Sequence, residues 1–331
     1  MVFIKVTFVN VGYGDAVLFQ MDSGYNLLLD GGSDLPSEFE GDVYRVRASE
    51  FLKTRGIQQL DAVIISHIHE DHVCGLEPIL RSVPVKQFYV PYPLEPFLNG
   101  RELKAGPEAA RSVPMYTAAL NAYRRILLDA DKTGTPVRVL TAGEELEPVP
   151  GIRMHVLAPR TAALNAYMER IRQAYDTDSS QEKITRLLTE LDATSNGTSL
   201  LLRIEAENQA FLMAADSCPR EWNEVPLFLL NNVTVLKLPH HGQIDSVNEQ
   251  IMEKMRPAYV VTTASSDRRY NSANTKAYER MKELWPENGG PRFLFTDERE
   301  YPPYFSQPDG FQAIQFVVSS GRIKPGFIKI K

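Results

Sequence analysis

The chain has 331 residues, 43% of them hydrophobic and 24% charged, which is the composition of an ordinary globular protein. Its apolar runs are far shorter than the roughly 20 residues of a membrane span, so we expect neither a transmembrane segment nor a membrane partner. The net charge of −6 gives no general attraction to nucleic acid. Acidic side chains that bind cations would account for part of that charge, so a nucleic-acid substrate is not excluded.

The N-terminal residues and the cysteine content favour a cytoplasmic protein. Residues 1–6 have the pattern of a strand and lack the basic, apolar and small-residue regions of a signal peptide. The two cysteines, Cys74 and Cys218, are too few for a disulfide scaffold. We therefore expect a reducing, cytoplasmic location.

Residues 1–90 predict a β-sheet with helical crossovers. A hairpin that turns at residues 22–24 ends in Asp30, beside two glycines. The alternation of later strands with helices indicates a parallel, buried sheet. The expected strands are 2–9, 16–20, 25–29, 60–65 and 85–90, and the expected helices are 43–55 and 75–82.

Residues 91–192 fit this pattern less well. The stretch 91–114 is rich in proline and glycine and longer than most loops of compact domains, so it is either a rim beside the substrate or ordinary packing. The sequence leaves both open. Residues 161–192 read as two polar helices, which we interpret as an insertion that could contact a protein partner. The elements expected between these stretches are a helix at 115–131 and strands at 137–140 and 152–158.

The order of elements in the first 90 residues returns after residue 196. A hairpin again ends in an aspartate, Asp216, and a later strand again ends in histidine, at His240 and His241. This repetition predicts a single domain over residues 1–331, in which two related β-sheets pack face to face with both histidine sets at one edge. The remaining strands are expected at 199–204, 209–215, 233–238, 258–264, 292–295, 311–318 and 322–330, the last two completing the second sheet, and the helices at 219–230, 246–255 and 274–284.

Five of the six histidines fall in two short strings, each at the end of an apolar run. The first string carries His67, His69, Asp71 and His72. Imidazole nitrogens and carboxylates bind borderline divalent metals, and H-x-H on an extended segment lets alternate side chains reach one ion from one face. Asp71 and His72 can then serve a second ion, so the string predicts a metal site. The sixth histidine, His155, is expected to be an ordinary sheet residue.

The pattern H-x-H-x-D-H after a β-strand resembles the signature of the metallo-β-lactamase superfamily. The strings at 8–16 and 27–32 resemble the opening of the ComEC-type hydrolase domain, a competence-associated branch of that superfamily. The resemblance implies an α/β fold, an αββα sandwich of two mixed β-sheets with helices on the outer faces. It also implies two divalent metal ions, zinc or manganese, as cofactors, with Asp30 hydrogen-bonded beneath them.

The resemblance further implies ligands for both metal positions. These would be His67 and His69 for the first ion, Asp71, His72 and His240 for the second, and Asp216 as a bridge. His240 is preferred to His241 because it comes first after the strand, but the choice stays open. Asp71 and His241 would also be catalytic, Asp71 in orienting the nucleophile and His241 in donating a proton to the substrate or leaving group.

This chain departs from the family at three places. Most members have another histidine before the second hairpin, where this chain and the ComEC-type sequences have an asparagine, here Asn196. We expect Asn196 to support the metals, and a first ion with fewer nitrogen ligands, which shifts the preference toward manganese. Gln243 replaces the serine that is usual after His-His-Gly, and residues 269–274 lack the usual His-Pro pair.

The family chemistry predicts a metal-dependent hydrolase in which water between the two ions is deprotonated and attacks the substrate. A phosphodiesterase or nuclease acting on DNA or RNA is favoured. The alternatives are hydrolysis of a small ester, lactone or phosphorylcholine-type group, and a non-catalytic metal-binding interaction module. Cys74 and Cys218 each follow a proposed ligand by two residues. They are expected to be small buried hydrophobes, with a redox or soft-ligand role as the alternative.

Overall fold

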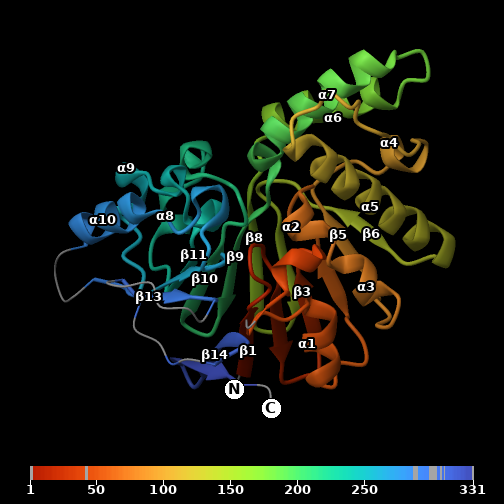
Figure 1. Ribbon diagram of the computed structural model, residues 1–331. Coiled ribbons are helices and arrows are strands. Elements are labelled where there is room, and N and C mark those ends of the chain that lie inside the picture. Colours follow the sequence, from red (N-terminus) through yellow and green to blue (C-terminus); the bar gives the residue numbers. More distant parts are fainter. Residues whose placement is uncertain are drawn as a thin grey trace.

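The computed structural model describes residues 3–41, 44–285, 290–297, 304–305, 308 and 310–329. Two β-sheets face each other, and helices cover the outer surface of each (Figure 1). The αββα sandwich that the resemblance implied is therefore confirmed.

The first sheet has the strand order β15-β14-β1-β2-β3-β4-β5-β6. In this order, β14, β1 and β2 are each antiparallel to the next strand, whereas β3, β4, β5 and β6 run parallel to one another. The strand bounds are β1 (Phe3–Val9), β2 (Val17–Met21), β3 (Asn26–Leu29), β4 (Ala62–Ile64), β5 (Phe88–Val90), β6 (Val137–Val139), β14 (Ala313–Ser319) and β15 (Arg322–Ile328).

The second sheet has the order β13-β12-β11-β10-β9-β8-β7 and repeats this plan. Strand β9 pairs antiparallel with β10, and β10, β11, β12 and β13 run parallel. The strand bounds are β7 (Glu145–Val149), β8 (Ile152–Ala158), β9 (Leu201–Ala206), β10 (Gln209–Met213), β11 (Val235–Lys237), β12 (Tyr259–Thr262) and β13 (Arg292–Phe295). The sequence pattern missed β7.

The two tail strands correct the predicted topology. They were expected to complete the second sheet, but β14 pairs along the whole of β1, from Phe3 opposite Ser319 to Val9 opposite Ala313, and β15 pairs with β14. Both therefore extend the first sheet, and residue 330 of the expected strand lies outside the described residues. An alternating strand pattern reports which face is buried but not which sheet edge it joins.

The helices divide between the two outer faces. Apolar side chains of α1, α3, α5, α6 and α7 join the core on the first sheet, and those of α8, α9 and α10 join the core on the second. The bounds are α1 (Ala48–Thr54), α2 (Glu70–Val73), α3 (Leu76–Leu80), α4 (Glu95–Leu98), α5 (Ser112–Thr133), α6 (Thr161–Tyr175), α7 (Gln181–Thr194), α8 (Leu227–Leu230), α9 (Glu249–Met252) and α10 (Thr275–Leu284). Among the described helices, none combines the length and apolar composition that crossing a bilayer requires.

Three predicted helices are shorter than expected. The segment 219–230 contains a 3₁₀ turn, Pro219–Trp222, and the single turn of α8, because Pro226 between them has no backbone N–H to donate. Helix α1 begins at Ala48, although residue 43 of the predicted helix lies outside the described residues. Of the helix predicted at 246–255, only α9 forms.

A third apolar core fills the space between the sheets. Strand β4 shows how each strand serves two cores, because Val63 faces the helices while Ala62 and Ile64 face the opposite sheet. Burial on both faces explains the unbroken apolar run before the first histidine string. The predicted strand is thus held rigidly from two sides at the point where the ligand-type residues begin.

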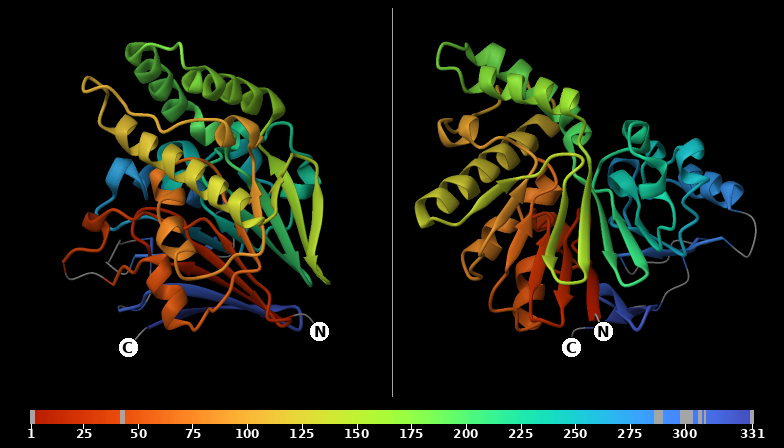
Figure 2. Two further views of the ribbon diagram at one scale, coloured as in Figure 1. Left: turned by 90° about the vertical axis from the view of Figure 1, so that its right-hand side faces the viewer. Right: turned by 180° about the vertical axis from the view of Figure 1, so that it is seen from behind.

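Residues 91–192 contribute both packing and part of the site. Tyr92, Phe97 and Leu103 are buried in the core on the first sheet, whereas Ser112, at the start of α5, lines the cavity described below. Helices α6 and α7 form an antiparallel pair that projects beyond the sheets in all views (Figure 2). That this region is an insertion in a single domain stays a prediction.

The contact between the sheets can be tested at Phe316, a fully buried residue of β14 whose ring contacts Phe211 and Tyr259 of the second sheet. Phe316→Ala should lower the free energy of unfolding by about 3–5 kcal/mol, because it leaves a cavity between the sheets. Urea denaturation followed by circular dichroism measures this change. Phe228→Ala, at a side chain that is 71% exposed, is the matched control and should change it by less than about 0.5 kcal/mol. Equal effects of the two changes would contradict the placement of β14.

Candidate metal centre

Ligand-type side chains gather where strands of both sheets end. The first histidine string follows β4, Asp216 follows β10, and His240 and His241 follow β11. Parallel strands end at a common edge, which is where open α/β sheets bind ligands. Two sheets therefore supply one site.

The donor atoms form two groups that share Asp216. In the first group, His67 Nε2 lies 3.1 Å from His69 Nδ1 and 3.8 Å from Asp216 Oδ2. In the second, Asp216 Oδ1 lies 3.4 Å from His72 Nε2 and 3.2 Å from His241 Nε2. Asp71 completes the second group, with Oδ2 2.9 Å from His241 Nε2.

Each of the four imidazoles is held by an acceptor at its outer nitrogen. When the outer nitrogen carries the proton, the lone pair of the inner nitrogen faces the other donor atoms. Metal-binding histidines are usually oriented in this way. The outer contacts are His67 Nδ1 to Ser66 Oγ at 3.0 Å, His69 Nε2 to the Asp192 carbonyl oxygen at 3.3 Å, His72 Nδ1 to Asp30 Oδ2 at 2.9 Å, and His241 Nδ1 to the Thr263 carbonyl oxygen at 2.6 Å.

Two buried carboxylate oxygens at the centre of this arrangement indicate cations. Asp71 Oδ2 and Asp216 Oδ1 have no hydrogen-bond partner among the described residues, although buried polar atoms nearly always have one. Burial alone would raise the pKa of Asp216, but the His241 and His72 imidazoles outweigh it and hold that pKa well below its usual range. Anionic oxygens and nitrogen lone pairs facing one another fit divalent metal ions.

The structure reverses the preference for His240. His241 belongs to the second donor group, whereas His240 Nε2 faces the side-chain nitrogens of Asn196, at 3.0 Å, and Gln243, at 2.9 Å. The cause is the backbone. Residues Pro239–Gly242 form a turn in which both histidines have left-handed dihedrals, with φ of 46° and 50°, so the alternation of a strand does not continue through them.

Asp30 and Asn196 lie on two sides of the centre. Asp30 is fully buried beneath the first histidine string, where it accepts hydrogen bonds from the Ser66 backbone N–H at 2.8 Å and the Ser66 hydroxyl at 2.6 Å, besides its contact with His72. Asn196 Nδ2 faces His240, and Asn196 Oδ1 is buried without a partner among the described residues. The first donor group thus has two imidazoles and no third within the described part of the chain.

A buried lysine beneath the centre was missed from the sequence. Lys237 is 1% exposed, and its Nζ lies 2.6 Å from Asp15 Oδ2 and 2.8 Å from the carbonyl oxygen of Ala215. Asp15 in turn donates its backbone N–H to the Asp71 carbonyl oxygen. A lysine inside the apolar strand β11 was the available signal, because lysine is almost never fully buried unless paired.

The close approach of Asp71 requires glycine at position 14. Gly14 has φ of 134°, and a Cβ there would lie 2.3 Å from the Asp71 carbonyl oxygen. The Gly-rich turn after β1 therefore lets the loop that carries Asp71 pack directly against it. That contact ties the N-terminal turn to the second donor group.

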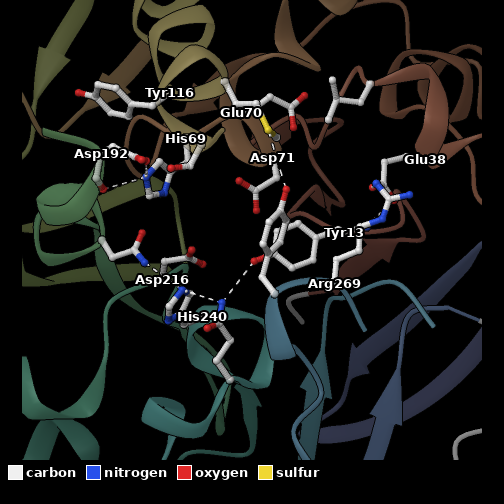
Figure 3. A pocket seen from close by; sticks show the side chains of 16 residues that line it. Tyr13, Glu38, His69, Glu70, Asp71, Tyr116, Asp192, Asp216, His240 and Arg269 are labelled. Carbon is white, nitrogen blue, oxygen red and sulfur yellow. Dashed lines mark hydrogen bonds and ion pairs between the residues drawn. The ribbon is translucent and has the colours of Figure 1, made fainter. Parts of the chain in front are cut away.

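A cavity of about 220 Å³ opens above the donor groups (Figure 3). Tyr13 and Asp192, which sequence reasoning also missed, lie on opposite sides of it. A neighbouring hollow shares four of its lining residues, Ser112, Met115, Arg269 and Tyr270, and adds Ser37 and Arg111. The labelled residues that line the first cavity are Tyr13, Glu38, His69, Glu70, Asp71, Tyr116, Asp192, Asp216, His240 and Arg269.

The remaining residues discussed from the sequence lie apart from the donor groups. His155 lies on β8 beside Glu145 and Glu205, which confirms it as a sheet residue. Cys74 is partly buried against the core on the first sheet, as expected of a small hydrophobe. Cys218 is buried, but its thiol lies beside His240 and Asp245.

The support from Asp30 can be tested with Asp30→Asn. This change keeps the size of the side chain but puts an amide in place of a carboxylate that accepts from His72, so the affinity for manganese should fall about 10–100-fold. Competition with a chromogenic chelator measures that affinity. Asp178→Asn, in an exposed turn, is the control and should leave it unchanged. An Asp30→Asn protein with the affinity of the wild type would show that His72 does not depend on this contact.

Two comparisons with known sequences show what the chain is similar to. Residues 9–163 match the model of the metallo-beta-lactamase superfamily. ComE operon protein 3 of Bacillus subtilis (strain 168) is 21% identical over 323 residues, which is 91% of this chain and 34% of that protein. The chain thus spans about a third of the length of this relative.

Three solved structures resemble the chain more loosely. They are a metal-dependent hydrolase from Parabacteroides distasonis ATCC 8503 (13% identity, TM-score 0.41, 88% of this chain and 92% of that one), a diphosphatase from the PhnP family (14%, 0.39, 92% and 100%) and Zn²⁺-bound PqqB from Methylobacterium extorquens (10%, 0.41, 89% and 97%). Residues 9–163 thus resemble the metallo-beta-lactamase superfamily, and most of the chain is similar to about a third of ComE operon protein 3.

Proposed function

We propose that the chain is a dinuclear phosphodiesterase whose substrate class is DNA or RNA. One observation carries the proposal: the two donor groups share Asp216 at the floor of a cavity whose rim carries arginine. Shared carboxylates hold two ions side by side in enzymes that cleave phosphate esters. Zinc and manganese are the proposed ions, and the small number of imidazoles in the first group favours manganese there.

The metal ligands in this proposal come from both sheets. His67 and His69 would hold the first ion, Asp71, His72 and His241 the second, and Asp216 both. When bound, the ions would lower the pKa of a water between them and polarise a phosphoryl oxygen of the substrate. Asp71 also reaches the cavity, where it can orient the attacking water.

Tyr13 takes the donor role that the sequence reasoning gave to His241. His241 has its Nε2 among the ligands and its Nδ1 on the Thr263 carbonyl oxygen, so it has no proton to give to a substrate. The ring of Tyr13 packs against that of His241 at an angle of 44°, with the centroids 4.4 Å apart, and Tyr13 lines the cavity. Burial raises the pKa of Tyr13 well above its usual value, and Asp71 and Asp216 raise it further. Its hydroxyl therefore stays protonated and can donate to an oxygen on which charge develops.

The neighbouring hollow supports a substrate longer than one phosphate group. Tyr270 is 55% exposed there, and Arg111 forms no ion pair with a described residue. Arg269 is the less available arginine, because Glu38 and Asp267 pair with it. Single-stranded nucleic acids bind to surfaces that combine stacking rings with cations along the backbone. A phosphodiester held over the ions would leave the next nucleotide over Tyr270 and its phosphate near Arg111.

The volume of the cavity favours a second candidate function. About 220 Å³ is smaller than the roughly 300–1,000 Å³ of ordinary small-molecule sites, so a compact group fits it without the neighbouring hollow. A small ester, lactone or phosphorylcholine-type substrate would use the same ligands.

The cytoplasmic location and a protein partner at 91–192 stay predictions.

Metal content and cleavage test the main proposal together. The purified protein should bind manganese or zinc and cleave bis-p-nitrophenyl phosphate and linear and circular DNA. Asp71→Ala should lower kcat about 10³-fold, roughly 4 kcal/mol, because it removes a ligand and an orienting group. Tyr13→Phe should lower kcat more than it raises KM. Asp178→Ala is the surface control.

The outcomes separate the candidates. Cleavage of a small ester but of no phosphodiester would support the second candidate function. Bound metal with no turnover on any of these substrates would refute a hydrolase of either kind and support a non-catalytic module.

The substrate class can be tested at Arg111. Arg111→Ala should raise KM for single-stranded DNA several-fold. It should also make KM less dependent on salt concentration, by the amount expected for the loss of about one contact with a phosphate. The same change should leave KM for bis-p-nitrophenyl phosphate unaltered, because that substrate is too short to reach Arg111. Arg172→Ala, on the exposed face of α6, is the matched control. A parallel loss on both substrates would argue against binding of a strand at this hollow.

A further inference from the structure

A third group of ligand-type side chains lies outside the metal centre. Cys218 Sγ lies 3.3 Å from Asp245 Oδ2 and 3.9 Å from His240 Nδ1, and His240 Nδ1 lies 3.2 Å from the same Asp245 Oδ2. The three residues follow β10, β11 and the His-His turn. A pocket that opens between α6, α7 and these turns is lined by all three.

The three donor atoms have the spacing of a metal site. Tetrahedral zinc with one sulfur, one nitrogen and one oxygen ligand places these atoms about 3.3–3.6 Å apart, and the observed distances of 3.2 to 3.9 Å need shifts of only a few tenths of an ångström. A thiolate and a carboxylate balance the charge of a divalent ion. The open pocket leaves room for water as the fourth ligand.

A catalytic triad does not explain the group. In such a triad, the thiol and the carboxylate bind opposite nitrogens of the imidazole. Here Cys218 and Asp245 both approach Nδ1 of His240, and Nε2 is turned toward Asn196 and Gln243. Convergence of three donors on one point is the geometry of ligands around an ion.

The surroundings of Nε2 supply an independent observation. A ligand at Nδ1 requires a proton on Nε2, and that proton requires an acceptor. Asn196 Nδ2 lies 3.0 Å from Nε2, while Asn196 Oδ1 is buried without a partner among the described residues. A half-turn of the Asn196 amide brings its oxygen to His240 Nε2 as the acceptor. Gln243 Nε2 also lies 2.9 Å from His240 Nε2, so the tautomer requires the same half-turn of the Gln243 amide.

We propose that Cys218, His240 and Asp245 form a separate binding site for a thiophilic divalent metal ion, zinc above all. On binding, the thiol of Cys218 loses its proton to solvent and the thiolate becomes a ligand. The site shares none of its three ligands with the two donor groups of the metal centre. A sulfur ligand makes it softer than that centre, whose donors are nitrogen and oxygen, so the two sites differ in the metals they select.

Cobalt binding by the full-length protein tests the proposal without relying on hydrolysis. Cobalt(II) bound to a thiolate gives an absorption band in the near ultraviolet. When the wild type is titrated with cobalt, the intensity of this band should correspond to one thiolate-bound ion per chain. Cys218→Ser should lose the band and bind one zinc ion fewer than the wild type. Cys74→Ser is the matched control, because Cys74 is the other cysteine of the chain, and should retain both.

Two further variants separate this site from the metal centre. Asp71→Ala, which damages that centre, should keep the thiolate band. Asp245→Asn should weaken the cobalt binding that produces the thiolate band, and it provides this test even if Cys218→Ser fails to fold. A wild type without the band would overturn the proposal and leave a hydrogen-bonded Cys218–Asp245–His240 group. Loss of the band in Asp71→Ala would overturn it as well, since Cys218 would then belong to the metal centre.

Discussion

Repulsion between buried carboxylates and imidazole lone pairs is the constraint on which this site depends. Asp71 and Asp216 face the inner nitrogens of His72 and His241, and the outer nitrogens are already bound, so the rings cannot turn away. Burial lowers the pKa of both histidines, but Asp216 and its neighbours outweigh burial and raise it above the usual value. Metal ions bound between these groups would relieve the repulsion, and because both sheets provide the donors, binding would also stabilise the contact between the sheets.

The ends of the strands hold this arrangement through unusual backbone conformations. Asp30, Ala215, His240 and His241 all have positive φ, which costs a residue other than glycine roughly 1–3 kcal/mol. Hydrogen bonds across neighbouring strands offset the cost. The Ala215 carbonyl oxygen accepts from the His240 backbone N–H and from Lys237, and the Asp30 backbone N–H donates to Ile64. Strained turns anchored in three apolar cores thus aim side chains that a regular strand would direct elsewhere.

These backbone conformations explain which features of the site could be predicted from the sequence alone. The string from His67 to His72 sits at the end of a doubly buried strand, so its residues and their clustering were predictable, as was the sandwich from the repeated order of elements. The choice between His240 and His241 depended on two left-handed residues, which no local pattern reports. Tyr13 and Asp192 reach the cavity by tertiary contact, and the pairing of β14 with β1 joins residues more than 300 positions apart. Such long-range choices are made by packing and leave no periodic signal.

The two histidines of the His-His turn face two different groups of donor atoms, and Asn196 contacts one of these histidines. His241 points to a centre of nitrogen and oxygen donors, while His240 points to a thiol and a carboxylate. Asn196 adds no imidazole to the first donor group, and its side-chain nitrogen contacts His240. Asn196 also lines the cavity, and its side-chain oxygen is buried without a partner among the described residues. The orientation of this single amide would therefore help to set which nitrogen of His240 carries the proton, and with it the occupation of the proposed sulfur-containing site.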